Sequence, residues 1–164
     1  MKSGAEIKNV NGRAIYADGG TVTMDGMISD IQSNTHMWNA CQGIALHLRG
    51  GASATFSGTI QNVKSTDNDS YVVYDVSSSI AFKSGSTIKN CFGTAKYGSL
   101  IYSTGLTKEA LLDGTITECH MPNNLIYSAN SNFPTSIGPN AQITNNSGSR
   151  LFYDNSVLDL QNAP

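Results

Sequence analysis

The chain has 164 residues, of which 13% are charged, and its formal net charge is −2. A chain of this length builds one domain with a continuous core, so we expect a single domain over residues 1–164. The slightly negative charge argues against nucleic-acid binding, and no apolar run is long enough for a membrane span. Few charged residues and abundant Gly, Ser, Thr and Asn favour short strands joined by turns over helices.

A short motif returns along the whole chain. The opening segment Met1–Val10, MKSGAEIKNV, returns almost unchanged as Phe82–Cys91, FKSGSTIKNC. Each copy of the motif contains one isoleucine, and successive copies lie 21 to 32 residues apart by subtraction of these positions. The isoleucines are Ile7, Ile28, Ile60, Ile88, Ile116 and Ile143. Regular self-similarity of this length is typical of a repeat protein whose units stack.

A second strand follows each copy of the motif and a third strand follows five of the six copies, and all of them alternate apolar and polar residues. The second strands are expected at residues 14–16, 45–47, 72–74, 100–102, 125–127 and 151–153. The third strands are expected at residues 22–24, 54–56, 80–82, 110–112 and 158–160. Three short strands in each repeat predict an all-β protein, a three-sided parallel β-helix (β-solenoid) of about six coils.

Asp-Gly pairs at Asp25-Gly26 and Asp113-Gly114 are a signal for β-hairpins, which would give a different fold. Both pairs occur at the same phase of the repeat, however, so we interpret them as corners between strands of one coil. Equivalent residues of successive coils then stack about 4.8 Å apart in parallel, in-register strands.

Stacking turns each repeat position into a row of side chains along the solenoid. The isoleucines form one inward row, and Val10, Ile31, Val63, Cys91 and Cys119 form another. A polar row of Asn9, Asp30, Asn62, Asn90, Glu118 and Asn145 occupies a corner, where such side chains satisfy turn backbone groups. Cys91 and Cys119 should therefore be inward neighbours, and we expect both to be thiols because parallel side chains do not point at each other. Three cysteines without C-x-x-C spacing argue against a disulfide framework or a zinc site. We also expect no cofactor.

One segment resembles a known class of repeat. Residues 19–30, GGTVTMDGMISD, resemble the Gly-Gly-Thr-x-Thr-Met-x-Gly-Gly-x-Ile-x-x-Asn repeats of adhesin-like parallel β-helix proteins on bacterial surfaces. Met27 and Asp30 depart from that pattern, where the family has Gly and Asn. The resemblance implies a secreted or surface-anchored bacterial protein, and it specifies the fold better than the ligand.

The chain reads as a fragment of a longer solenoid. Met1 aligns with Met24 and Phe82 at the end of a third strand, and residues 161–164 resemble the entry to another coil. Solenoids need polar caps, and neither end reads as one. We therefore expect a signal peptide and an anchor to lie outside this segment.

A row of aromatic side chains is the first candidate for function. The residues next to it along each second strand are apolar and point inward, so alternation directs the row outward. Such a stripe suits a sugar or a protein partner, because tyrosine combines a rigid apolar body with a polar tip. The alternative is a ladder that only stabilises the sheet. The row comprises Tyr16, His47, Tyr74, Tyr102, Tyr127 and Tyr153.

The longest repeat contains an insertion, residues 33–43, which is the second candidate. Met37 and Trp38 lie in it, and tryptophan is a frequent anchor of binding surfaces. Trp38 is equally suited to covering an outer sheet face. His36, Cys41 and His47 match no metal-binding pattern, so we expect no metal.

An enzyme is the rival interpretation, since many β-helix proteins cleave acidic polysaccharides with clustered carboxylates. Asp25 and Asp113 share a repeat position, but they lie three coils apart, which is too far for a catalytic pair. Asp75 and Asp154 also share a repeat position, and Ser103 and Ser128 occupy it in the two coils between them. The outward residues of the first strands include no carboxylate and are Lys8, Ser29, Gln61, Lys89, Thr117 and Thr144. We therefore expect no catalytic residues.

The sequence thus predicts a non-catalytic binding module that recognises a host or environmental glycan or protein, such as mucin or immunoglobulin. Recognition would use a lateral face or the loop with Trp38, because extended solenoid faces often serve as binding surfaces. Two alternatives remain: a polysaccharide-cleaving enzyme and a purely structural spacer.

Overall fold

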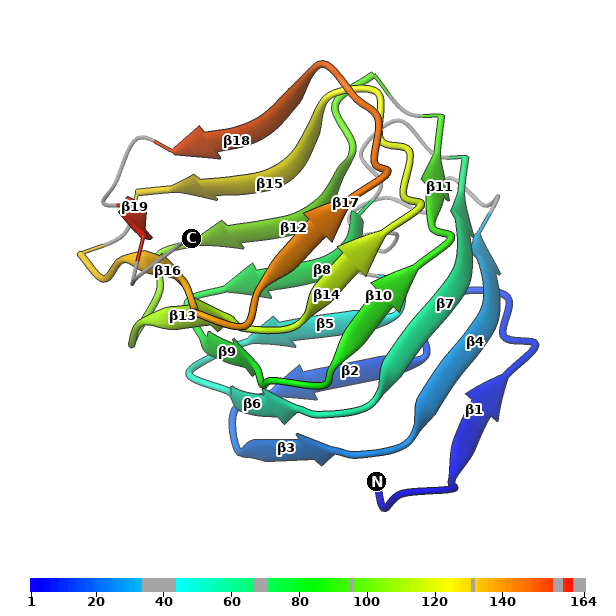
Figure 1. Ribbon diagram of the computed structural model, residues 1–164. Coiled ribbons are helices and arrows are strands. Elements are labelled where there is room, and N and C mark those ends of the chain that lie inside the picture. Colours follow the sequence, from blue (N-terminus) through cyan, green and yellow to red (C-terminus); the bar gives the residue numbers. More distant parts are fainter. Residues whose placement is uncertain (34–43, 67–70, 95, 131, 155–157, 161–164) are drawn as a thin grey trace.

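The computed structural model describes residues 1–33, 44–66, 71–94, 96–130, 132–154 and 158–160 (Figure 1). Within these residues the chain forms nineteen short strands and no helix. None of the described segments is therefore a helix of the length and apolarity that a membrane span requires.

The strands form three parallel sheets, and the chain visits them in turn (Figure 1). The first sheet contains β1 (Glu6–Lys8), β4 (Met27–Ser33), β7 (Thr59–Ser65), β10 (Thr87–Lys89), β14 (Thr115–Thr117) and β17 (Gln142–Thr144), with β11 (Phe92–Gly93) beside β7. The second contains β2 (Ile15–Asp18), β5 (Leu46–Arg49), β8 (Tyr71–Val76), β12 (Ser99–Thr104), β15 (Asn124–Ala129) and β18 (Arg150–Asp154). The third contains β3 (Thr21–Met24), β6 (Ser53–Phe56), β9 (Ser79–Phe82), β13 (Ala110–Leu112), β16 (Thr135–Ile137) and β19 (Leu158–Leu160).

Successive coils pair in register, so that Ile60 lies between Ile28 and Ile88 in the first sheet. The predicted all-β, parallel β-solenoid is therefore confirmed. The expected six coils are slightly too many, because the solenoid has about four turns. Within the part of the chain that the structure describes, the strands β1–β3 at one end and β17–β19 at the other pair with a neighbouring strand on one side only.

The corner after the first sheet depends on a left-handed backbone conformation. All six residues of the predicted polar row have positive φ angles between 51° and 57°. Asparagine and aspartate tolerate this region because their short side chains hydrogen-bond locally. The side chains also bond along the row, since Asn62 Nδ2 donates to Asp30 Oδ1 (2.9 Å) and Asn90 Nδ2 donates to Asn62 Oδ1 (2.7 Å). The row is thus an amide ladder that fixes the corner.

The corner between the third and first sheets depends on close backbone approach. A Cβ atom on Gly58 would lie 1.8 Å from the Gly26 carbonyl oxygen of the preceding coil. Only glycine fits at that distance, which explains why the Asp-Gly and Ser-Gly pairs mark corners. The hairpin alternative at Asp25-Gly26 is excluded by the parallel pairing of β3 with β6 and of β4 with β7.

The interior is a continuous apolar column. Ile28, Ile60, Ile88 and Ile116 are at most 4% exposed, and the edge members Ile7 and Ile143 are half-buried. Cys91 and Cys119 are each 1% exposed and are free thiols, as the sequence predicts. Burial, followed by contact with Cys119, raises the pKa of Cys91 well above its usual value. These thiols therefore behave as small apolar core groups.

Ile88→Ala tests the stacked interior. Ile88 is 1% exposed and lies between Ile60 and Ile116, so the substitution leaves a cavity bounded by two coils. We expect the free energy of unfolding to fall by about 2–5 kcal/mol in urea denaturation. Lys89→Ala on the exposed side of the same strand is the matched control and should change it by less than about 0.5 kcal/mol. Equal effects of the two substitutions would contradict the inward assignment.

Candidate binding surfaces

The six aromatic residues predicted on the second strands form one continuous row across the second sheet. Every neighbouring pair of them is in register, from Tyr16 beside His47 to Tyr127 beside Tyr153. Their neighbours along the four interior strands β5, β8, β12 and β15 are buried, as Leu46 and Leu48 on either side of His47 illustrate. We call this row the tyrosine ladder (Tyr16, His47, Tyr74, Tyr102, Tyr127 and Tyr153).

The rings of the tyrosine ladder stack on one another along the solenoid axis. Tyr102 and Tyr127 have ring centroids 4.7 Å apart with planes 2° from parallel, and Tyr127 and Tyr153 are 4.8 Å apart and 3° from parallel. At the other end the contacts turn edge-to-face, with 70° between Tyr16 and His47. Stacking covers both ring faces of Tyr102 and Tyr127, each of which lies between two parallel rings. A partner would therefore meet ring edges and the hydroxyl groups they carry, not open ring faces.

Each end of the tyrosine ladder carries an arginine. The Arg13 guanidinium lies 5.4 Å from the centroid of the Tyr16 ring, and that of Arg150 lies 5.5 Å from the centroid of the Tyr153 ring. Both arginines stand three residues before the tyrosine that they cover. A cation over a ring face is attracted by the ring quadrupole, so these contacts occupy the two terminal faces of the ladder.

Two features of this surface differ from the sequence prediction. His47 was expected to be exposed, but its side chain is only 5% exposed. Tyr71 was not predicted as part of the surface, yet its ring packs against those of Tyr74 (5.2 Å) and Tyr102 (4.6 Å). The exposed part of the ladder therefore consists of Tyr16, which is 47% exposed, and the half-buried tyrosines. Met37 and Trp38, together with His36 and Cys41, lie outside the described residues.

A second outward row follows the amide ladder around the corner and was missed in the sequence. Short strand β11 and isolated bridges align its members across the coils. Phe92 in this row is 43% exposed, and its ring stacks on His120 at 5.3 Å with 21° between the planes. The sequence signal is weak, because the row has no common residue type. Its members are Asn11, Gln32, Lys64, Phe92, His120 and Ser147.

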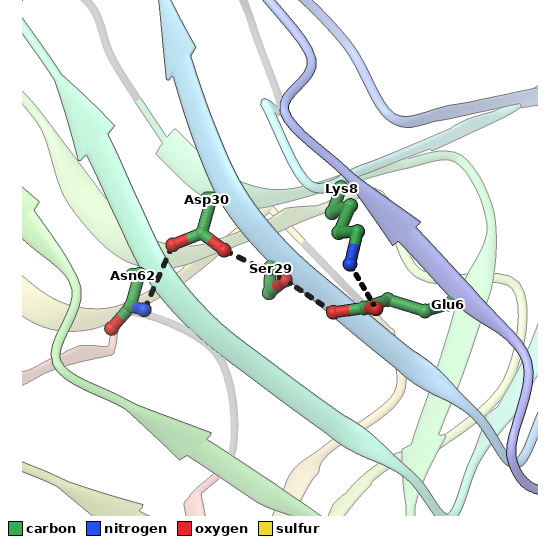
Figure 2. A network of polar contacts seen from close by, with 5 residues as sticks. All are labelled: Glu6, Lys8, Ser29, Asp30 and Asn62. Atoms are coloured by element: carbon green, nitrogen blue, oxygen red, sulfur yellow. Dashed lines mark hydrogen bonds and ion pairs between the residues drawn. The ribbon is translucent and has the colours of Figure 1, made fainter.

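A chain of polar contacts lies beside this corner on β1, β4 and β7 (Figure 2). The Ser29 hydroxyl is 2.8 Å from Glu6 Oε1 and 3.1 Å from Asp30 Oδ2, and it has one proton to donate between them. Lys8 forms an ion pair with Glu6 Oε2 at 3.0 Å. Asn62 completes the chain through its bond to Asp30. The sequence prediction placed Ser29 on the surface, whereas it is 1% exposed.

The carboxylates of Glu6 and Asp30 thus face one hydroxyl, a pair that the sequence did not predict. Hydrogen bonds from Ser29 and then from Lys8 lower the pKa of Glu6. A glycosidase needs instead a general acid whose pKa is raised.

Asp113, another carboxylate considered in the sequence, has a structural contact. Its Oδ1 accepts a hydrogen bond from the Asn140 backbone N–H (2.8 Å) and so stabilises a turn. Among the described residues, no cluster of three or more His, Cys, Asp or Glu is placed to hold a metal ion.

A groove lies at the corner between the amide ladder and the second outward row. Its volume is about 350 Å³, and we call it the corner groove. Three coils contribute to it, and its floor is formed by the residues that turn inward at the corner, Val10 and Ile31. The side chains on its two flanks are polar and exposed; they are Asn9, Asp30 and Asn62 on one flank and Asn11, Gln32 and Lys64 on the other.

Asp75 lies inside the solenoid. It stands beside Ser103 in register, and Ser128 follows in the next coil. Its side chain is 0% exposed, and neither carboxyl oxygen has a hydrogen-bond partner among the described residues. Burial raises the pKa of Asp75 to about 7; the nearby Ser78 hydroxyl opposes the shift, although it donates its hydrogen bond to the Val76 carbonyl oxygen (2.8 Å). A buried carboxyl of this kind weakens the fold when it ionises.

Asp75→Asn tests this assignment. Because the pKa rises from 3.8 to about 7 on folding, the folded state holds the proton more tightly, and stability falls as the pH rises from about 4 to about 7. The Asp75→Asn variant lacks this loss, so its free energy of unfolding relative to the parent should increase by on the order of 4 kcal/mol between pH 4 and pH 8. Urea denaturation at each pH measures the difference. Asp25→Asn, at an exposed position, is the control, and a pH-independent difference for Asp75→Asn would contradict the burial argument.

Comparison with models of protein families, with curated proteins and with solved structures gives no match to this chain. The function is therefore inferred from the surfaces of the solenoid.

Proposed function

We propose that the chain is a non-catalytic binding module of a secreted or surface-anchored bacterial protein. It recognises a host or environmental glycan or protein through the second-sheet face that carries the tyrosine ladder. The observation behind this proposal is the ladder itself, a continuous aromatic row with outward edges on a rigid parallel sheet. Aromatic residues with a polar tip are typical anchors of binding surfaces.

The stacking geometry narrows what this face binds. Sugars pack their C–H faces on open aromatic ring faces, and in the ladder the interior ring faces already contact each other. The tyrosine hydroxyl groups repeat at the spacing of the coils along the ring edges. They suit hydrogen bonding to a protein surface, such as that of an immunoglobulin or a mucin polypeptide. The ladder therefore supports a protein partner over a stacked sugar.

The same stacking also favours a second candidate, a structural spacer. Aromatic pairs between neighbouring strands stabilise a sheet by about 0.2–1 kcal/mol each, with no partner required. A spacer would need the ladder for rigidity alone. The two candidates differ in what the tyrosine hydroxyls contribute, because only binding uses them.

The combined substitution Tyr127→Phe and Tyr153→Phe separates binding from a spacer role. Both changes preserve ring stacking and remove the hydroxyl groups. We expect the midpoint of thermal unfolding to stay unchanged. Binding to immobilised mucin or pooled immunoglobulin should become at least about five-fold weaker, because two hydrogen bonds are lost. Surface plasmon resonance measures the affinity, and circular dichroism measures the unfolding.

Tyr127→Ser is the matched stability variant, since it removes a ring from the middle of the stack and should lower the midpoint of unfolding. Unchanged binding by the double phenylalanine variant, or no binding of the parent to either probe, would reject the proposal. A fall in stability for Tyr127→Ser alongside that result would then assign the ladder to a spacer.

A further inference from the structure

The corner groove is a second surface with a chemistry of its own. Its exposed flanks present four amide side chains, one carboxylate and one ammonium group, from Asn9, Asn11, Gln32, Asn62, Asp30 and Lys64. The one carboxylate and the one ammonium group balance each other in charge. The groove therefore offers many hydrogen-bond donors and acceptors without a net charge to attract an ion.

Hydrogen bonds within the protein hold one flank of the groove in place. Asp30 Oδ1 accepts a hydrogen bond from Asn62 Nδ2 (2.9 Å), and Asp30 Oδ2 lies 3.1 Å from the Ser29 hydroxyl, which shares its one proton between Asp30 and Glu6, as Figure 2 shows. Asn62 is held in turn by Asn90 (2.7 Å). Their left-handed backbone, with φ of 54° at both Asp30 and Asn62, aligns the two side chains at the spacing of adjacent coils. A flank held in this way loses little conformational entropy when a ligand binds.

An exposed aromatic ring lies one coil beyond Lys64, the last residue that lines the groove. Phe92 lies beside Lys64 in register, one coil farther along the outward row. One face of the Phe92 ring stacks on His120 in the next coil. Because the two planes are only 21° apart, the opposite face of Phe92 is directed back toward the coil of Lys64. Among the described residues, Phe92 stacks on one ring only, and its opposite face lies on the side of Lys64, a residue that lines the groove.

We propose that the corner groove binds a neutral saccharide. Amide and carboxylate groups on the two flanks bond to sugar hydroxyls, and the Phe92 ring packs against the C–H face of a neighbouring sugar unit. The volume of about 350 Å³ lies at the lower end of the range for small-molecule sites, which suits one or two sugar units. The proposal concerns a different surface from the tyrosine ladder, so either can fail without the other.

The test is titration of the full chain with neutral oligosaccharides. Calorimetry would use cellotetraose, maltotetraose, and separate pools of neutral and sialylated oligosaccharides released from mucin. We expect at least one neutral sample to bind and the sialylated pool to bind no more tightly. The side-chain amide signals of Asn9, Asn11 and Gln32 should shift in nuclear magnetic resonance spectra, whereas those of Asn123 and Asn140, which lie outside the groove, should not.

Variants locate the binding. Gln32→Ala and Phe92→Ala should each weaken it at least about five-fold, and Asp30→Asn should weaken it while keeping the corner, since asparagine fills this row in four other coils. Lys89→Met is the matched control for Lys64→Met, because both remove an exposed ammonium group and only Lys64 lines the groove. Circular dichroism verifies the fold of each variant.

Several results would overturn the proposal. The first is that the folded parent binds no neutral sample, and the second is that it binds the sialylated pool more tightly. The third is an equal loss of saccharide affinity in Lys64→Met and Lys89→Met. The fourth is unchanged saccharide affinity in Gln32→Ala and Phe92→Ala. The variant with Tyr127→Phe and Tyr153→Phe should bind the saccharide as the parent does. Loss of saccharide binding in that variant would place the sugar on the tyrosine ladder and reject the corner groove.

Discussion

In-register parallel pairing of successive coils is the constraint on which the rest of the structure depends. Once Ile28, Ile60 and Ile88 are aligned, the strand positions of the repeat have their counterparts as neighbours in the next coil. Like residues then stack, so that amides bond to amides at one corner and tyrosine rings stack across the second sheet. The inside, the corners and the lateral faces of the solenoid all follow from one register.

This constraint makes exceptions within a row informative. Asp75 stands in an interior row where the following coils have Ser103 and Ser128, and its carboxyl is buried without a hydrogen-bond partner in the described residues. His47 interrupts the tyrosine ladder and turns its stacked contacts edge-to-face. Neither residue disrupts pairing, because the backbone ladder does not depend on side-chain type. A coil can therefore carry a local departure while its neighbours keep the register.

The sequence predicts rows well and contacts between rows poorly. The isoleucine, amide and tyrosine rows could be identified because each repeats one residue type at one phase. The outward row from Asn11 to Ser147 repeats no residue type, and its alignment appears only once the left-handed corner is built. Glu6 meeting Ser29 of the next coil, and Tyr71 packing on Tyr102, depend on how far a side chain reaches across rungs.

The two proposed surfaces use the repeat in opposite ways. The tyrosine ladder offers nearly the same group at every coil, so a partner gains contact area but little information about its position along the axis. Several of its ring faces also pack against each other and are therefore not open to a partner. In the corner groove the residue type changes from one coil to the next. Asp30 stands in a row of asparagines, and Lys64 stands between Gln32 and Phe92. Specificity is a difference between the affinities for two partners, and groups that differ from their neighbours can create such a difference. In a solenoid of stacked like residues, selective recognition is therefore best sought where the repeat is broken.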